Sequence, residues 1–377
     1  MCKAGARMAW ILPLFLLMTA AGRGKPPKEI RVLIGEASQA LLLEGTGLKA
    51  QSSRRKISAR SGKIELTVSK GKLVYKGKDL GASVKVTGSG PVSLNGHSYP
   101  GMLRIEKSGD KFLIVNVLSV ESYLEGVVRN EMSVKWPLEA LKAQTVLART
   151  YALEKISQPR SEKYDLVASV EDQVYTGVAE RDPASQQAIR ETEGEVLYYR
   201  SELAEVFYHS CCGGQTESAE YVWTGVGRPY LQSIKCDHCQ ECPYFFWRFP
   251  DTGVLGPEEL AARLGYQGEA VEEISIAETS PSQRALKLKV RFKGGHIEEI
   301  SGSDFRLRLG REGVRSTFFR VQKEPSGFII FGSGSGHGVG LCQWGAKGMA
   351  EQGKKYRELL EFYFPGTELK KICQERR

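Results

Sequence analysis

The chain has 377 residues, 41% of them hydrophobic, and a formal net charge of +9. This length leaves room for two or three domains with substantial apolar cores. The basic excess fits an exported protein that meets anionic polymers or lipid surfaces of the cell envelope, and for such a protein it argues against nucleic acid as the partner. The basic residues are dispersed beyond Ser53–Lys56, so an excess that only aids solubility is the alternative.

The first residues have the pattern of an export signal. Lys3 and Arg7 precede a short apolar run, Met8–Met18, and small residues follow it up to Ala21. We predict a signal peptide over residues 1–22 and a location in the periplasm or cell envelope. An uncleaved membrane anchor is the alternative. Since no other stretch is long enough to cross a bilayer, membrane contact would be confined to this segment.

Short apolar or alternating segments dominate residues 23–117. Gly, Ser and Asn separate them, as in a small antiparallel sheet or a barrel-like lobe. The segments are IRVLIG, KIELTV, KLVYKG, SVKVTG, GMLRIE and KFLIVNV.

Residues 118–369 alternate helical and strand patterns and form the predicted catalytic core, with residues 370–377 as a tail. The expected helices are 137–156, Pro183–Glu193, PEELAARLG, DFRLRLG and Tyr356–Phe364. The expected strands are VLYYR, LAEVFYHS, ALKLKVRFKG, HIEEISG, TFFRVQ and GFIIFGSG, and residues 250 to about 286 have a less regular pattern. The fold class predicted is mixed α+β, with a β-rich N-terminal lobe and a core around a central helix.

One carboxylate stands out at the start of this core. Glu131 lies in a short NEM turn, just before the helix 137–156, whose apolar positions predict one buried face. Lys142 and Arg149 are seven residues apart, so they point nearly the same way, about 10 Å apart along the axis. A proton donor beside two cations could hold and protonate an anionic or polyhydroxyl ligand. The alternative is an ordinary solvated surface.

Several segments together resemble the stage II sporulation protein D family, which includes proteins described as amidase enhancers. They follow the family order over most of residues 29–369. They are NVLSVESYLEGVVRNEM, WPLEALKAQTVLARTYAL, DQVYTG, FYHSCCGGQTESAEYVW, PYLQSI, LGREGVRSTFF and GSGHGVGLCQWGAKGMAEQGKKYRELLEFYFPGTEL.

The resemblance implies a peptidoglycan lytic transglycosylase. Such an enzyme cuts the β-1,4 bond between N-acetylmuramic acid and N-acetylglucosamine, preferring glycan strands without stem peptides. The family's acid/base residue corresponds to Glu131, and its functional Lys and Arg correspond to Lys142 and Arg149. A site tyrosine of some members corresponds to Tyr244.

This chemistry requires a protonated Glu131 near neutral pH, so we expect surroundings that are apolar or short of positive charge. We therefore expect Lys142 and Arg149 to bind sugar or lactyl groups and not to pair with Glu131. Gln173 and Tyr175, in DQVYTG, and His337, in the glycine-rich GSGSGHGVG segment, complete the expected substrate-binding set.

The cysteines are clustered, with CDHCQEC at 236–242 and an adjacent pair at 211–212. Such spacing suits a tetrahedral Zn²⁺ site. The resemblance implies a structural zinc near the active site, held by His209, Cys212, Cys236 and Cys239, with Cys242 or His238 as substitutes. Disulfides, natural in an exported protein, and an iron–sulfur cluster are the alternatives. We expect no organic cofactor, and Cys342 to be a small buried hydrophobe.

Two further classes of function remain open. The protein could be a non-catalytic, wall-binding enhancer of a cell-wall amidase, which would not need a titratable Glu131. It could also be a purely structural zinc module, which would not need Lys142 and Arg149. The presence of Glu131, Lys142 and Arg149 together favours the enzyme, with peptidoglycan glycan strands as its partner.

Overall fold

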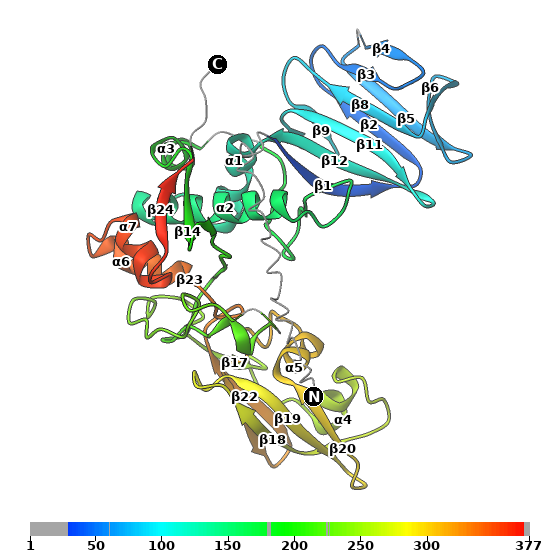
Figure 1. The fold of residues 1–377 in the computed structure, drawn as a ribbon. Coiled ribbons are helices and arrows are strands. Elements are labelled where there is room, and N and C mark those ends of the chain that lie inside the picture. The colour runs from blue at the N-terminus through cyan, green and yellow to red at the C-terminus, as the bar shows by residue number, and fades with distance from the viewer. Residues whose placement is uncertain (1–28, 60, 179–181, 224, 226, 373–377) are drawn as a thin grey trace, which may run out of the picture.

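The computed structural model describes residues 29–59, 61–178, 182–223, 225 and 227–372. Three bodies follow one another in Figure 1: a β-rich N-terminal lobe, a helical core, and a third lobe of strands with two short helices. The fold is mixed α+β with a β-rich N-terminal region, as predicted. The segment 1–22, predicted as a signal peptide, lies outside the described residues.

Two sheets make up most of the N-terminal lobe. The seven-stranded sheet has the strand order β13-β1-β12-β11-β8-β3-β4; it is antiparallel except at one edge, where the short β13 (Leu166–Val167) pairs parallel with β1. The other sheet is antiparallel and has the order β10-β9-β2-β5-β6-β7. Their inner faces share one core, because alternate residues such as Leu43 and Ile64 in one sheet and Val86 and Leu103 in the other are buried together. The strands are β1 (Glu29–Ala37), β2 (Ala40–Glu44), β3 (Lys49–Gln51), β4 (Lys56–Ser58), β5 (Lys63–Ser69), β6 (Lys72–Tyr75), β7 (Lys78–Gly81), β8 (Ser83–Thr87), β9 (Val92–Leu94), β10 (His97–Tyr99), β11 (Met102–Ser108) and β12 (Lys111–Ser119).

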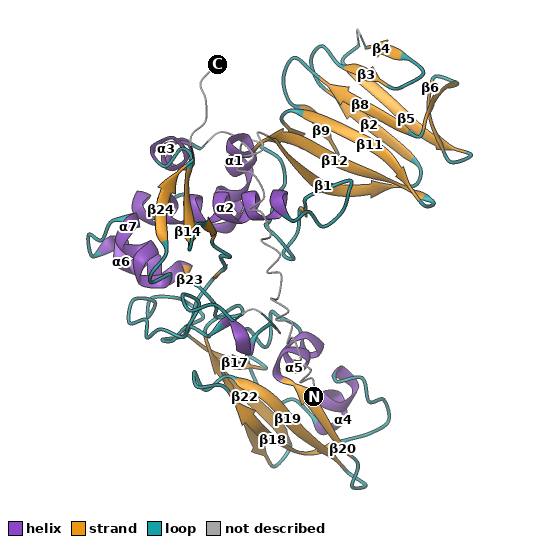
Figure 2. Cartoon of the chain, in the orientation of Figure 1, coloured by secondary structure: helices purple, strands orange, loops and turns teal. Residues whose placement is uncertain are grey.

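The helical core surrounds α2 (Leu138–Ser157). This helix contacts α1, α3, α6, α7 and β14, so it is buried on every side and not on one face as predicted. The other elements are α1 (Val120–Glu131), β13 (Leu166–Val167), α3 (Pro183–Glu191), β14 (Glu195–Tyr199), β15 (Glu202–Leu203), β16 (Tyr208–His209), a 3₁₀ turn (Ala219–Tyr221), β23 (Leu341–Cys342), α6 (Gln343–Glu351), α7 (Tyr356–Tyr363) and β24 (Glu368–Lys371). Figure 2 shows these helices gathered between the two β-rich parts.

The predicted NEM turn is helix in the structure. Ser119 caps α1, since its side chain accepts a hydrogen bond from the Ser122 N–H, and the helix continues to Glu131 before Met132 leaves it in an extended conformation. β12 crosses the predicted domain boundary at residue 117 and leads directly into α1. The N-terminal lobe is therefore joined to Glu131 through one continuous strand and helix.

The third lobe has a hydrophobic core of its own, which includes Leu260, Leu288, Phe292, Phe305 and Phe328. Its elements are β17 (Phe246–Phe249), α4 (Pro257–Arg263), β18 (Val271–Thr279), β19 (Ala285–Phe292), β20 (Ile297–Ser301), α5 (Gly302–Leu309), β21 (Phe319–Glu324) and β22 (Gly327–Ser333).

Two segments differ from the sequence prediction. β18 lies in the stretch predicted to be irregular, and LAEVFYHS, predicted as one strand, forms only the short β15 and β16. Among the described residues, no helix is both long enough and apolar enough to span a bilayer.

Candidate active site and cysteine cluster

Glu131 presents a half-buried carboxyl group at the C-terminal end of α1. Its Oε1 accepts a hydrogen bond of 2.8 Å from the Val174 N–H, and the Tyr208 hydroxyl lies near the same carboxyl group, where its hydrogen bonding acts to lower the pKa of Glu131. Burial raises the pKa of Glu131 above its usual value, while these two hydrogen bonds oppose the rise. Burial therefore shifts Glu131 toward the proton-bearing form relative to an exposed glutamate, which is the direction that an acid catalyst needs.

A chain of hydrogen bonds orients the Tyr208 hydroxyl. The Tyr123 hydroxyl donates to Gln173 Oε1 at 3.0 Å, and Gln173 Nε2 donates to the Tyr208 hydroxyl at 3.2 Å. Because the Tyr208 oxygen accepts from Gln173, its own hydrogen is available to Glu131. Gln173, predicted as a ligand-binding residue, thus lies one hydrogen bond away from the carboxyl group.

The segment 172–176 is fixed on both sides of the Val174 N–H. The Asp172 carboxylate accepts from the Tyr151 hydroxyl at 2.6 Å and from the Val167 N–H at 2.8 Å. The Tyr175 hydroxyl donates to Asn116 Oδ1 at 2.7 Å inside the N-terminal lobe. These anchors hold the Val174 N–H in position against Glu131.

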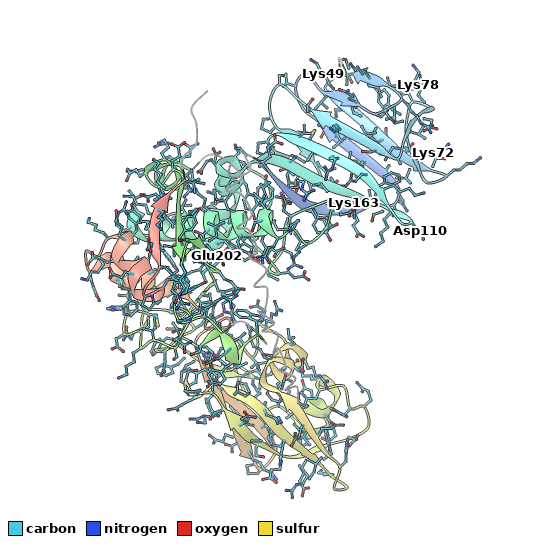
Figure 3. All side chains as sticks on the ribbon, in the orientation of Figure 1. Lys49, Lys72, Lys78, Asp110, Lys163 and Glu202 are labelled. Atoms are coloured by element: carbon cyan, nitrogen blue, oxygen red, sulfur yellow. The ribbon has the colours of Figure 1, made fainter. Side chains whose placement is uncertain are left out.

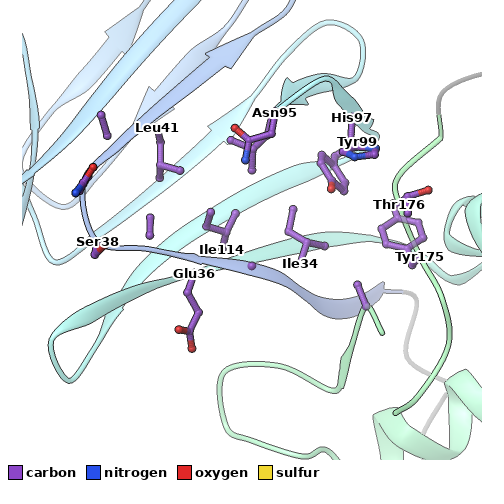
Figure 4. A pocket seen from close by; sticks show the side chains of 16 residues that line it. Ile34, Glu36, Ser38, Leu41, Asn95, His97, Tyr99, Ile114, Tyr175 and Thr176 are labelled. Atoms are coloured by element: carbon purple, nitrogen blue, oxygen red, sulfur yellow. The ribbon is translucent and has the colours of Figure 1, made fainter. Parts of the chain in front are cut away.

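Tyr175 also lines a cavity of about 560 Å³ beside β1 and β10 (Figure 4). The aliphatic side chains of Ile34 and Ile114 form part of its lining, and Asn95 and Tyr99 lie on the opposite side. Tyr175 itself is 2% exposed, so in this structure it supports the segment 172–176 more than it offers a contact surface.

The two predicted ligand-binding cations form ion pairs with other acids. Arg149 is fully buried, and its guanidinium bonds both oxygens of Glu121 at 2.8 Å and the Glu195 carbonyl at 3.1 Å. Lys142 pairs with Glu139 at 2.9 Å and with Glu191 at 2.6 Å. Neither cation pairs with Glu131, as expected, but both fasten α2 to its neighbours and Arg149 has no surface open to a ligand.

His337 and Tyr244 occupy different surroundings. His337 Nε2 donates to the Tyr208 carbonyl at 3.0 Å, and its Nδ1 accepts from the Val339 N–H. Burial lowers the pKa of His337 to about 4, so the ring is neutral and positions the Tyr208 backbone. Tyr244 is 39% exposed, and the Arg315 guanidinium lies 4.0 Å from the centre of its ring.

Four buried thiols gather between the core and the third lobe. The Sγ atoms of Cys212, Cys236, Cys239 and Cys342 all lie within 4.8 Å of one another, and those of Cys212 and Cys239 are 3.5 Å apart. All six cysteines among the described residues are free thiols. Four sulfurs at this spacing fit a tetrahedral metal with metal–sulfur distances of about 2.3 Å.

The structure groups Cys342, and not His209, with the three predicted cysteine ligands. His209 is held by a 3.1 Å contact between its Nδ1 and the Val339 carbonyl, and its buried Nε2 has no hydrogen-bond partner. Neither proposed substitute, Cys242 or His238, belongs to the group. Cys342 comes 100 residues after the CDHCQEC segment, at the N-cap of α6, and so carried no spacing signal.

Sequence reasoning also missed Tyr208. The residue lies in the FYHSCCGG segment, where the neighbouring histidine and cysteines indicate metal binding. Its parallel pairing with β23, Tyr208 opposite Leu341, brings it beside the glycine-rich segment. A tyrosine next to a metal-like motif gives no sequence signal of a contact with Glu131.

Comparisons with known proteins identify the family to which the chain belongs. Residues 108–199, which include α1, Glu131 and α2, match the family described as stage II sporulation protein, and residues 255–340 match a domain of unknown function. The chain is 30% identical to stage II sporulation protein D of Bacillus amyloliquefaciens, over 68% of this chain and 75% of that protein. The chain belongs to the stage II sporulation protein D family.

The chain is also similar to two other proteins. An uncharacterised protein of Brachyspira hyodysenteriae is 38% identical over 74% of this chain and 73% of its own length. The amidase enhancer of Bacillus subtilis is 30% identical over 82% of this chain, which spans only 50% of that longer protein. The family is thus represented both by a sporulation protein and by an enhancer of an amidase.

Proposed function

We propose that the protein is an exported peptidoglycan lytic transglycosylase with Glu131 as its single acid/base residue. The observation that carries the proposal is the half-buried Glu131 carboxyl, whose pKa is raised by burial and which has no ion pair with Lys142 or Arg149. Family membership and the basic character of the chain support glycan strands of the cell wall as the substrate.

The proposed reaction needs only one carboxyl group. Protonated Glu131 gives its proton to the glycosidic oxygen as the bond from C1 of N-acetylmuramic acid breaks. The C6 hydroxyl of the same sugar then bonds to C1 and closes a 1,6-anhydro ring. Its proton passes to the Glu131 carboxylate, which regenerates the acid without consuming water. The Val174 N–H and the Tyr208 hydroxyl stabilise the carboxylate between the two steps.

The test is Glu131→Gln, assayed on peptide-stripped glycan strands with mass spectrometry of the products. We expect the release of anhydro ends to fall at least about a hundredfold, because the amide cannot donate this proton. Glu272→Gln, which changes an exposed carboxylate of the third lobe, is the control for charge. Retained activity in a folded Glu131→Gln variant would remove Glu131 from the mechanism, and hydrated reducing ends would indicate a hydrolase.

The second candidate is enhancement of an N-acetylmuramoyl-L-alanine amidase, and similarity to the amidase enhancer of Bacillus subtilis favours it. An enhancer needs a wall-binding surface but no proton donor. If Glu131→Gln and the parent protein stimulate a purified amidase equally, and neither cleaves glycan, the enhancer function replaces the enzyme.

We also propose that the four-thiol group holds a structural Zn²⁺. The ligands would be Cys212, Cys236, Cys239 and Cys342, and the Cys342 sulfur already accepts hydrogen bonds from the Cys212 N–H at 3.2 Å and the Gly345 N–H at 3.3 Å. Such N–H donors suit a thiolate. Bound zinc would supply a cross-link between segments; the acid/base chemistry is assigned to Glu131 alone.

A further inference from the structure

Net charge is divided unequally along the chain. Residues 29–117, the β-rich lobe, contain 15 Lys and Arg against 7 Asp and Glu, a net charge of +8. Residues 118–377 contain 33 Lys and Arg against 37 Asp and Glu, a net charge of −4. The basic character of the mature protein therefore belongs to the lobe and not to the core that carries Glu131. Figure 3 shows lysines of this lobe, such as Lys49, Lys72 and Lys78, far from the helical core.

Strand register lines up cations on the outer face of the seven-stranded sheet. Lys56 on β4 is opposite Gln51 on β3, Gln51 is opposite Lys85 on β8, and Lys85 is opposite Arg104 on β11. Directly paired residues share one face of a sheet, so these three cations form a row across four strands. Neighbouring strands are about 4.8 Å apart, which puts Lys56 roughly 10 Å from Lys85. Lys49 lies on the same face, two residues before Gln51.

This row is short of compensating charge. Lys49, Lys56 and Lys85 are exposed, and among the described residues no carboxylate lies within ion-pair distance of any of them. Arg104 differs from the three lysines: it is half-buried, pairs with Glu106 at 3.4 Å and donates to the Lys163 carbonyl.

The face is also polar where it is exposed. The apolar part of the same sheet surface, Val115 and Val117, is buried under Tyr164. None of the large exposed hydrophobic side chains in the described residues lies among Lys49, Lys56, Lys85 and Arg104. A bilayer-binding surface normally adds apolar side chains that insert between lipids. The residues of this face therefore favour a water-soluble anionic polymer over a membrane as its ligand.

We propose that Lys49, Lys56 and Lys85 form a binding surface for a linear anionic polymer whose charged groups recur along the chain. Phosphodiester and carboxylate groups both offer the required chemistry. The surface would retain the protein on such a polymer whether or not Glu131 is catalytic. It is thus independent of the proposed enzymatic function.

The test measures binding of the purified protein to two soluble polymers and to vesicles at several salt concentrations. Polyglycerol phosphate carries phosphodiesters, peptide-stripped glycan strands carry lactyl carboxylates, and phosphatidylglycerol vesicles offer the membrane alternative. All proteins carry Glu131→Gln, so that the glycan is not degraded. The test variant is Lys49→Gln, Lys56→Gln and Lys85→Gln together. The matched control is Lys70→Gln, Lys76→Gln and Lys78→Gln, which removes equal charge from exposed lysines at the other sheet of the lobe.

We expect at least one polymer to bind, and the test variant to weaken that binding by about tenfold or more while the control variant changes it little. The dependence of log K on log salt should become shallower by roughly two to three for the test variant, about one per cation removed. The polymer that binds identifies the anionic group. Equal weakening by both variants, no weakening, no polymer binding, or binding to vesicles alone would each overturn the proposal.

Discussion

Glu131 combines two features that normally oppose each other. Burial disfavours its carboxylate, yet the Val174 N–H and the Tyr208 hydroxyl are in place to stabilise that carboxylate. A group that must first give a proton and then take one benefits from both, because neither protonation state is held too tightly. The balance depends on Tyr208, whose hydroxyl is oriented by Gln173 and whose backbone is held by His337.

Tyr208→Phe tests this balance through pH. The Tyr208 hydroxyl favours the carboxylate, so its removal should raise the pKa of Glu131 further. Since the protonated form starts the reaction, the alkaline limb of the kcat/KM profile should move to higher pH, while kcat at the optimum falls. Tyr123→Phe, whose hydroxyl bonds Gln173, should shift the limb less. A limb that moves to lower pH in Tyr208→Phe would contradict this account.

At the scale of elements, α2 shows what periodicity could and could not predict. The helix was predicted within a residue or two of its observed bounds, because Pro137 and the recurring apolar positions mark it. The surroundings of the helix were not predicted, because Arg149 and Thr150 are polar residues that lie buried against neighbouring elements. A polar residue whose partner is distant in sequence, such as Glu121 for Arg149, cannot be distinguished from a ligand-binding residue by spacing.

Arg149→Met separates these two roles. If the guanidinium is structural, its loss leaves Glu121 and the Glu195 carbonyl without a partner and lowers the free energy of unfolding by about 3–5 kcal/mol. Adding Glu121→Gln should recover part of this loss. Lys142→Met, on the same helix with more exposed partners, should cost about 1 kcal/mol or less. Denaturant unfolding of the parent protein and the three variants measures these free energies. Unchanged stability of Arg149→Met with a raised KM would instead indicate that Arg149 binds a ligand.

Sequence reasoning succeeded where a residue's role depends on its neighbours in the chain. Half of the twelve strands described in the N-terminal lobe, and α2, α3 and α7 among the five described helices of the core, follow from local alternation, helical spacing and caps. β18 was missed because Glu272, Glu273 and Ser275 leave it with few buried positions. The contacts of Tyr208 and Cys342 come from the parallel pairing of β16 with β23, which joins residues more than 130 apart. No local pattern records that pairing.

At the scale of the whole molecule, the four thiols join segments that are otherwise far apart in the chain. Cys212 follows β16, Cys236 and Cys239 lie in the loop before β17, and Cys342 begins α6. Arg284, at the turn between β18 and β19, donates to the carbonyls of Cys212 and Gln215 at 2.7 and 2.9 Å. The third lobe therefore contacts the cluster directly, and a metal there would fasten both lobe and core.

Metal analysis of protein purified without added zinc gives the last prediction. We expect about one zinc per chain, lost or strongly reduced in Cys342→Ser together with a lower Tm, because three thiolates leave the tetrahedral site open. Cys242→Ser removes a buried thiol of the same loop that lies outside the group, so it should keep the metal. His209→Gln decides between the two ligand sets. Zinc retained in Cys342→Ser but lost in His209→Gln would return the site to the ligands expected from the sequence, and a metal-free parent protein would exclude a stably bound zinc.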